Sequence, residues 1–495
     1  MSGATALAYA FAKQHGLVVL GVDDACVRVG LREDAPPLAL VEARRVLGRA
    51  LDVQVLPRVE FDRQLSQAYA DDTLGEAGDE SHQRFADSLE VLLEDIPATA
   101  DLLESQDDAP IIRLINGVIA EAARLGASDV HIEPFDTALR VRLRIDGVMR
   151  EALSLPPRLA PMLVSRVKVM ARLDIAEKRI PQDGRISVTI GAKALDVRVS
   201  TLPSRAGERV VLRILDKDQG TFALDDLAMP PRVAAALQQA LRQPNGIVLV
   251  TGPTGSGKTT TLYASLTRLN DGARNILTVE DPVEYAVEGV GQTQVNTKVG
   301  MTFAAGLRAI LRQDPDVVMI GEIRDAETAQ IAVQASLTGH LVLSTVHTND
   351  AVGAITRLRD MGVEPFLLAS TVRIVLAQRL IRRLCTGCRA LRDSDALSTQ
   401  VMGADYAGPL YRAVGCARCN HTGFAGRIGV YEAVVIDDTL RTLINANADE
   451  DALARAASMS SDWLADSARA RVAEGVTTPE EALRVARSMD THAHV

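Results

Sequence analysis

The segment with the clearest chemical meaning is a glycine-rich run at residues 252–259, which reads Gly-Pro-Thr-Gly-Ser-Gly-Lys-Thr. It fits the pattern G-x-x-x-x-G-K-[ST] completely, and it lies between an apolar stretch typical of a buried strand and a stretch typical of a helix. In that context the glycines let backbone N–H groups turn inward around phosphate oxygens, and the following helix adds its positive N-terminal end. We therefore predict a phosphate-binding loop (P-loop) for ATP or a close relative, rather than an unused glycine-rich turn.

The residues of this loop have separate expected roles. Lys258 is expected to reach the β- and γ-phosphates, and the hydroxyl of Thr259 is expected to ligate Mg²⁺. The predicted nucleotide-binding residues of the loop are Gly252, Pro253, Thr254, Gly255, Ser256, Gly257, Lys258, Thr259 and Thr260.

Hydrolysis of ATP needs a carboxylate near the γ-phosphate, and acidic residues follow two apolar runs. Residues 317–320 lead into Gly321 and Glu322, so Glu322 is the candidate general base or the group that holds a Mg²⁺-bound water. Residues 276–279 lead into a second acidic group, Glu280, Asp281 and Glu284. Carboxylates at the carboxyl ends of neighbouring strands converge where α/β folds bind ligands. The alternative for each is a solvated or helix-capping side chain.

Histidine and arginine side chains offer further contacts to a γ-phosphate. His347 follows an apolar run at 341–345 and could sense the γ-phosphate, with a structural histidine as the alternative. Arginine binds phosphate oxygens through two parallel N–H groups. The candidates from sequence position are Arg198 and Arg213 on predicted strands, and Arg308 and Arg312 on one helix face; a surface ion pair is the alternative for each.

Four of the five cysteines form two Cys-x-x-Cys pairs, Cys385 with Cys388 and Cys416 with Cys419. Two such pairs complete a tetrahedral set of four thiolates for Zn²⁺, and a site with four protein ligands is structural. The interval between the pairs must hold an insertion. Redox cysteines are the alternative, and Cys26 stands alone.

The elements that position these residues belong to several domains, because 495 residues exceed one hydrophobic core. We predict an α+β domain at 1–70 with short strands at 17–22 and 26–31 and helices at 38–51 and 61–70. An acidic linker at 71–108 follows. The remaining predicted parts are an antiparallel sheet with helices on one side at 109–218, a parallel α/β domain at 230–383, the cysteine region at 384–432 and a helical tail at 433–495. Within the sheet, an alternating strand at 139–145 is expected to enter a hairpin through a turn at Asp146 and Gly147, and in the tail Thr478 is expected to cap a helix that begins at Pro479.

The net charge of −10 is concentrated in the linker, which contains 13 acidic residues and one arginine, so the rest of the chain is nearly neutral. This distribution argues against nucleic acid as the main partner. No stretch approaches the ~18 apolar residues that a membrane span needs, and no secretory signal is recognisable. We therefore expect a cytoplasmic protein.

In combination, these motifs resemble the type II secretion ATPases (general secretory pathway protein E) of the secretion superfamily of P-loop ATPases. The resemblance rests on the P-loop, on an Asp box that reads Thr-Val-Glu-Asp-Pro-Val-Glu-Tyr, and on a His box; its stretches are 252–260, 278–285, 312–325 and 337–349, extended by 107–116, 127–133 and the cysteines. Gly321-Glu322 departs from the general Walker B pattern but matches this family's version.

The resemblance implies a RecA-like ATPase domain preceded by a PAS-like domain, a homohexamer, and ATP, Mg²⁺ and Zn²⁺ as cofactors. It implies that arginines from both domains contact nucleotide, which adds Arg324 and Arg427 to the four above. The first domain is expected to dock onto the cytoplasmic part of an inner-membrane partner, beside an inner-membrane platform protein, so that the ATPase is peripherally associated with the inner membrane. ATP hydrolysis is expected to drive pseudopilus assembly and export of folded proteins across the outer membrane.

Other classes remain open at this point. A type IV pilus assembly ATPase shares the main motifs, although residues 291–296 and the short first domain look more like the secretion branch. A DNA translocase or conjugation motor is disfavoured by the acidic composition. A scaffold that does not hydrolyse ATP is disfavoured because Lys258, Thr259 and Glu322 are all present.

Overall fold

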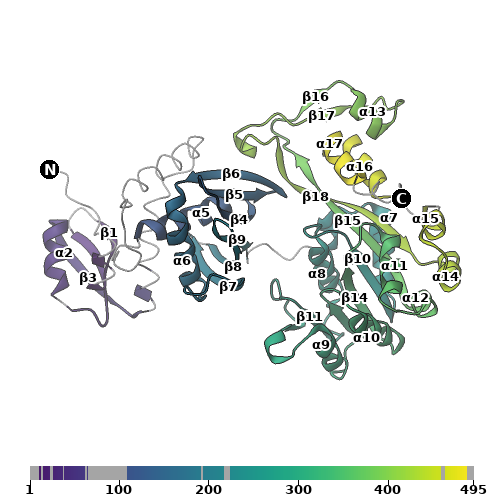
Figure 1. Cartoon of the computed structure of the whole chain (residues 1–495), viewed down its shortest axis with the longest axis horizontal. Helices are drawn as coiled ribbons and strands as arrows, with labels where there is room; N and C mark the ends of the chain where they lie inside the picture. The colour runs from purple at the N-terminus through teal and green to yellow at the C-terminus, as the bar shows by residue number, and fades with distance from the viewer. Residues whose placement is uncertain are drawn as a thin grey trace. The chain divides into compact units, whose positions relative to one another are not determined.

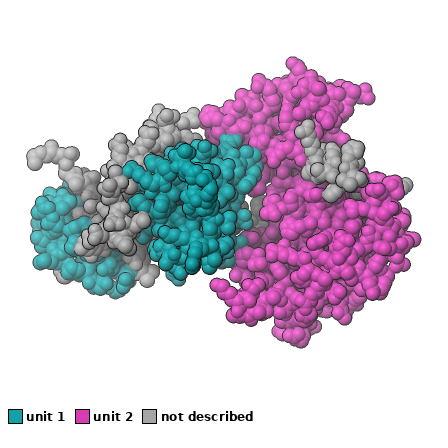
Figure 2. Space-filling view, in the orientation of Figure 1, with its two compact units in different colours: residues 1–219 teal, residues 220–495 magenta. Residues whose placement is uncertain are grey.

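The computed structural model describes residues 11–12, 15–22, 26–36, 38–58, 60–61, 64, 109–190, 193–216, 223–458 and 463–487. The chain divides into two compact units, residues 1–219 and 220–495 (Figure 2). The predicted linker at 71–108 lies outside the described residues. Among those described, no helix combines the length and the apolar composition that crossing a bilayer requires.

In the described part of the N-terminal domain, a three-stranded sheet shares one apolar core with helix α2 (Figure 1). Strands β1 (Leu17–Val22) and β2 (Cys26–Arg32) form where the sequence predicts strands, and they pair antiparallel, while β3 (Ala50–Leu56) pairs parallel to β2. The predicted helix over 38–51 is wrong at its end: α2 (Ala39–Leu47) stops at Gly48, whose positive φ of 63° ends the helix, and the chain enters β3. Most of the predicted helix at 61–70 lies outside the described residues.

The second domain is a six-stranded antiparallel sheet in the order β6-β5-β4-β9-β8-β7. Its two helices, α5 and α6, share one apolar core with the strands, as predicted. The expected turn at Asp146 and Gly147 joins β5 to β6, and both residues have positive φ. The elements are α5 (Ala109–Arg124), β4 (Ala127–Pro134), β5 (Leu139–Ile145), β6 (Val148–Leu155), α6 (Ala160–Met170), β7 (Gln182–Ile190), β8 (Lys193–Ser204) and β9 (Gly207–Asp216).

The second unit is built on a seven-stranded sheet in the order β12-β11-β13-β14-β10-β15-β18, parallel except for the β15–β18 pair. The four strands expected from apolar runs are all present. The sheet strands are β10 (Gly246–Thr251), β11 (Ile276–Glu280), β12 (Gly291–Gln294), β13 (Val317–Ile320), β14 (Leu341–Val346), β15 (Val372–Leu384) and β18 (Phe424–Val435). The helices beside it are α7 (Pro231–Leu241), α8 (Lys258–Leu269), α9 (Phe303–Ile310), α10 (Ala326–Leu337), α11 (Ala351–Asp360) and α12 (Pro365–Thr371).

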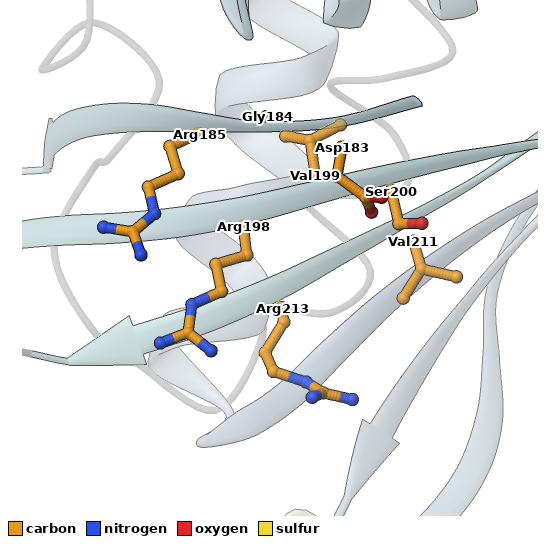
Figure 3. A pocket seen from close by; sticks show the side chains of 8 residues that line it. All are labelled: Asp183, Gly184, Arg185, Arg198, Val199, Ser200, Val211 and Arg213. Atoms are coloured by element: carbon orange, nitrogen blue, oxygen red, sulfur yellow. The ribbon is translucent and has the colours of Figure 1, made fainter. Parts of the chain in front are cut away.

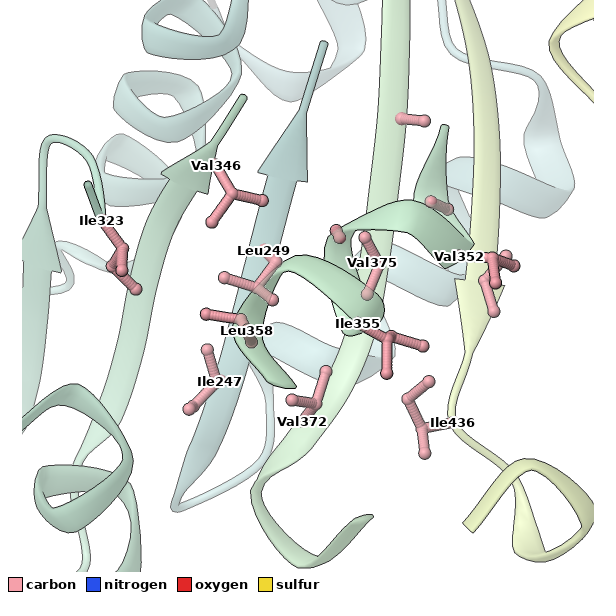
Figure 4. Packing of buried hydrophobic residues seen from close by; sticks show 14 of the residues in the cluster. Ile247, Leu249, Ile323, Val346, Val352, Ile355, Leu358, Val372, Val375 and Ile436 are labelled. Carbon is pink, nitrogen blue, oxygen red and sulfur yellow. The ribbon is translucent and has the colours of Figure 1, made fainter. Parts of the chain in front are cut away.

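Both faces of this sheet are covered, which explains why its strands are continuously apolar. Along β10, Ile247 and Leu249 enter one core while Val248 and Val250 enter another, because successive side chains point to opposite faces. Figure 4 shows the first core, where Leu249 lies among aliphatic side chains of β14, β15 and α11. The carboxyl ends of the parallel strands are thereby held at one edge.

The insertion expected between the cysteine pairs is a small hairpin with one helix, β16 (Ala390–Arg392), β17 (Leu410–Arg412) and α13 (Ala396–Met402). The tail is helical, as predicted, with α14 (Asp438–Asn445), α15 (Glu450–Ser458), α16 (Leu464–Ala473) and α17 (Pro479–Arg487). The expected N-cap of the last helix is present, because the N–H of Glu481 donates to the hydroxyl of Thr478.

Candidate nucleotide site

The P-loop leaves the carboxyl end of β10 and enters α8 at Lys258, as its pattern requires. Gly252, Gly255 and Gly257 all have positive φ, of 144°, 78° and 87°. A Cβ atom at Gly252 would lie 2.4 Å from the carbonyl oxygen of Gln378, so this position also excludes any side chain by contact. The loop therefore has the backbone conformation that turns N–H groups toward a bound anion.

Lys258 lies at the base of the loop with only 8% of its surface exposed. Its ammonium group donates to the carbonyl oxygens of Gly252 at 2.8 Å and Pro253 at 3.0 Å. Burial lowers the pKa of Lys258 to about 8, and the charge of Arg379 reinforces this shift while that of Glu322 opposes it. The side chain of Thr259, the candidate Mg²⁺ ligand, is exposed on the first turn of α8.

Glu322 follows β13 at the same edge, and its side chain is mostly buried. One carboxylate oxygen forms an ion pair with Arg324, and the other lies 3.1 Å from Nε2 of His347, which follows β14. Burial raises the pKa of Glu322, but the hydrogen bond and charge of Arg324 and the contact with His347 outweigh it and hold the pKa below its usual range. The structure thus brings three predicted site residues together, and the electrostatic influence of Glu322 extends to Lys258.

The three acidic residues of the Asp box lie in different environments. Glu280 is buried at the end of β11 and accepts hydrogen bonds from Tyr263, from Thr278 at 2.5 Å and from Gln292 at 3.1 Å. Burial and the hydrogen bond to Glu280 together raise the pKa of Tyr263. Asp281 and Glu284 are exposed, and the charge of Asp281 acts on Arg324. Glu280 therefore organises the strand end, while the charge of Asp281 acts on Arg324, the ion-pair partner of Glu322.

The arginines predicted in the second unit occupy separate positions. Arg308, on α9, pairs with Glu327 at 2.5 Å, and Arg312 donates to the carbonyl oxygen of Arg308 at 2.9 Å. Arg427 is exposed on β18, opposite Arg382 of β15. Arg324 is the predicted arginine in direct contact with Glu322.

In the second domain, three arginines stand in one row across neighbouring strands (Figure 3). Arg185 of β7 is the register partner of Arg198 of β8, which is the partner of Arg213 of β9. They line a pocket of about 370 Å³. Arg213 donates to Asp129 at 2.9 Å, and Arg185 lies 4.0 Å from Asp196. Like charges directly opposite one another on a sheet are unfavourable, so this row is suited to an anion.

The four paired cysteines meet at one point. Their Sγ atoms lie within 4.8 Å of one another, with contacts of 3.9 Å between Cys385 and Cys416, 3.7 Å between Cys388 and Cys419, and 3.8 Å between Cys416 and Cys419. A tetrahedral Zn²⁺ with Zn–S bonds of about 2.3 Å separates its sulfur atoms by about 3.8 Å. A disulfide needs about 2.05 Å. The donor set therefore fits a closed tetrathiolate metal site.

Sequence reasoning missed residues that contact the predicted ones. Gln378 of β15 bonds to the P-loop, Tyr263 of α8 bonds to Glu280, and Arg185 completes the arginine row. Gln378 directly follows an apolar run at 374–377, and a polar side chain at such a position was a detectable signal, because buried polar side chains need partners. For Arg185, the signal was a polar residue next to Ile186, which is buried, because neighbouring residues of a strand point to opposite faces.

Comparison with known families matches nearly the whole chain. Residues 104–484 match the family described as "Type II/IV secretion system protein", and residues 6–69 match a domain family described for "GSPII protein E". "Type II secretion system protein E" of Pseudomonas aeruginosa is 55% identical over 485 residues, which cover 97% of this chain and 96% of the relative. "Type II secretion system ATPase E" of Vibrio cholerae is 54% identical over 91% of this chain and 90% of the relative.

Solved structures share the fold at lower identity. The ATPase DotB of Legionella pneumophila superimposes with a TM-score of 0.56 at 19% identity, covering 80% of this chain and 98% of that protein. The pilus retraction motor PilT with bound ADP gives a TM-score of 0.51 at 24% identity, covering 76% and 98%. These likenesses support the multidomain α/β fold.

Proposed function

Because this chain belongs to the type II/IV secretion system protein family, we propose that it is the ATP-hydrolysing motor of a type II secretion system. In this role it would drive pseudopilus assembly and the export of folded proteins across the outer membrane. The observation that carries the proposal is the grouping of a complete P-loop with Lys258, Glu322 and His347 at one edge of a parallel sheet.

The loop's own groups account for nucleotide binding. Backbone N–H groups of residues 254–260 would face the phosphates, Lys258 would exchange its carbonyl partners for β- and γ-phosphate oxygens, and Thr259 would hold Mg²⁺. Bound Mg²⁺ would neutralise charge on the phosphates. Because burial lowers the pKa of Lys258 to about 8, a nearby phosphate would favour its charged form.

Glu322 is the proposed general base. Its pKa lies below the usual range, so the carboxylate is ionised at neutral pH and can accept a proton from the attacking water. Both of its oxygens are occupied, by Arg324 and His347. We propose that Arg324, which is 60% exposed and therefore movable, transfers to a phosphate oxygen, and that this transfer frees Glu322 and increases its basicity.

The arginine row of the second domain is the proposed second source of positive charge. Arg198 and Arg213 are the residues that the family resemblance implies, and Arg185 shares their row and pocket. Arginine forks bind phosphate oxygens in pairs, so such a row suits a triphosphate. Arg308, Arg312 and Arg427 of the other unit are proposed nucleotide contacts on family grounds.

The cysteine cluster is proposed to bind one structural Zn²⁺. Its support is the set of sulfur separations near 3.8 Å and the four protein ligands, which leave no open position for chemistry. The metal would fix the region beyond β15 and the hairpin β16–β17.

The partners and location follow from the same proposal. We propose a homohexamer in the cytoplasm, held at the inner membrane by residues 1–70 through the cytoplasmic part of a secretion-system protein, beside an inner-membrane platform protein, and without nucleic acid. Three apolar side chains of the N-terminal domain are exposed: Leu38 just before α2, Val41 on α2 and Val55 on β3. Exposed apolar side chains support a protein contact at this domain. In addition to the structural Zn²⁺, the chain would use ATP and Mg²⁺ as cofactors.

Two rival functions receive no specific support. The relatives at more than 50% identity carry type II secretion names, whereas the likeness to PilT, at 24% identity, concerns the fold alone. A DNA translocase is not favoured by any of these relatives.

The experiment that tests the proposed role is capture with residues 1–70 as bait, beside the full-length chain, from a membrane extract of the source bacterium. We expect both baits to retain an inner-membrane protein of the secretion apparatus. A bait with Leu38 and Val41 both changed to Ser should retain less of it. Retention of a pilus assembly protein instead would contradict the secretion assignment.

A further inference from the structure

We propose that Gln378 is a positioning residue of the nucleotide site, which fixes the P-loop in the conformation that binds phosphate. This inference rests on the proposed nucleotide-binding function and assigns part of it to a residue outside the predicted motifs. It is carried by the hydrogen bonds of one buried amide.

Gln378 stands where the P-loop leaves the sheet. The last register pair between β10 and β15 is Thr251 with Ala377, so Gln378 follows immediately beside Gly252. The side chain of Gln378 is 2% exposed. Its Nε2 donates to the carbonyl oxygen of Ser256 at 2.7 Å, and its Oε1 accepts from the hydroxyl of Thr261 at 2.8 Å. One amide therefore ties the middle of the P-loop to the first turns of α8.

The orientation of this amide is fixed by its partners. The carbonyl oxygen of Ser256 can only accept a hydrogen bond, so Nε2 must face it. The hydroxyl of Thr261 can then donate to Oε1. A flipped amide would place two acceptor oxygens against each other in a buried site, which is unfavourable.

The direction of the Ser256 carbonyl matters because a P-loop binds anions through its N–H groups. When a carbonyl of the loop is held from the side of β15, its peptide plane cannot rotate to present that oxygen to the phosphates. The amide of Gln378 also lies against the next residue of the loop, because a Cβ atom at Gly257 would lie 3.1 Å from Nε2 of Gln378. Gln378 therefore acts on the phosphates through the loop and not by touching them.

The neighbouring residue of β15 extends the same arrangement. Arg379 is largely buried, and its Nη2 donates to the carbonyl oxygen of Asn349, two residues beyond His347. Adjacent side chains of one strand thus hold the P-loop and the His box at the same edge of the sheet.

The test uses the full-length chain and a fluorescent ADP analogue with Mg²⁺ as probe. Gln378→Met keeps the shape of the side chain and removes both hydrogen bonds. We expect it to bind the probe at least fivefold more weakly than wild type. The matched control is Thr371→Val, which removes a part-buried hydrogen bond from the buried Thr371 to the carbonyl of Leu367 at 2.7 Å, in the last turn of α12 just before β15. This control should lose melting temperature but keep its affinity within twofold.

A second variant separates positioning from stability alone. Gln378→Glu places a carboxylate against the Ser256 carbonyl at neutral pH, but its protonated form can donate to that oxygen. Its affinity relative to wild type should therefore recover as pH falls, whereas that of Gln378→Met should not.

The outcomes are distinct. Folded Gln378→Met that binds within twofold of wild type would overturn the inference, as would an equal loss of affinity in Thr371→Val. Wild type that fails to bind the probe would instead contradict the proposed nucleotide site itself.

Discussion

Nε2 of His347 lies 3.1 Å from one carboxylate oxygen of Glu322, although 25 residues separate them in sequence. The contact joins the end of β14 to the end of β13, which are neighbours in the sheet. It links the proposed γ-phosphate sensor to the proposed base, so movement of either side chain changes the environment of the other.

The first prediction concerns Glu322 as the base. Glu322→Gln keeps the shape of the side chain but cannot accept a proton, so turnover should fall by roughly 10²–10⁴-fold. Nucleotide affinity should change little. Steady-state hydrolysis and probe binding measured side by side decide this, with the exposed Glu364→Gln as control. Loss of binding in Glu322→Gln would assign Glu322 to holding Mg²⁺ or the fold.

The second prediction concerns pH. The base must be ionised, so turnover declines as pH falls through its pKa. In the wild-type chain burial raises this pKa, but Arg324 and His347 outweigh burial. Arg324→Gln removes the larger opposing contribution, so the acidic limb of the kcat/KM profile should move to higher pH. The exposed-site control Arg274→Gln should leave the limb in place. An unmoved limb in Arg324→Gln would separate Arg324 from the basicity of Glu322.

The third prediction concerns the arginine row. Arg185→Ala and Arg198→Ala should each lower kcat about tenfold or more, because each removes a positive charge that is proposed to bind the phosphates. Neither should lower the melting temperature much, since removing one of several facing like charges relieves repulsion. Arg140→Ala on β5, which lies outside the pocket, should retain wild-type turnover. Full activity in Arg185→Ala would remove this residue from the site.

The fourth prediction concerns the metal. Elemental analysis should find one Zn²⁺ per chain, and strong chelation should lower the melting temperature by roughly 10 °C or more, because metal binding contributes to folding free energy. Cys385→Ser should mimic chelation, whereas Cys26→Ser should retain the metal. A stably folded wild-type protein without metal would contradict the assignment.

The motifs and apolar runs of the sequence were enough to predict the four strands that carry the site, the hairpin at Asp146 and Gly147, and the convergence of the cysteines. These features depend on local spacing or on complete motifs. The helix predicted over 38–51 failed because a single glycine, Gly48, ends α2 in mid-pattern. The spacing of apolar residues continues past Gly48 and therefore does not indicate where the helix ends.

Contacts between distant residues were beyond reach from one sequence. Gln378 and Thr261 are 117 positions apart, and their contact depends on β15 lying beside β10. Likewise, the spacing of acidic residues does not predict that Glu280 is buried and bonded to Tyr263 while Asp281, the next residue, is exposed. The finer domain boundaries and the individual arginine contacts stay predictions.

The central claim is that hydrolysis depends on the P-loop, and Lys258→Ala tests it most directly. Burial of Lys258 and its bonds to Gly252 and Pro253 place its charge at the base of the loop. The measurement is steady-state ATP hydrolysis by the full-length chain and by Lys258→Ala at equal protein concentration, with folding checked by melting temperature. The account predicts that the variant folds and loses at least about 10²-fold in rate. A folded variant that hydrolyses ATP at the wild-type rate would contradict it.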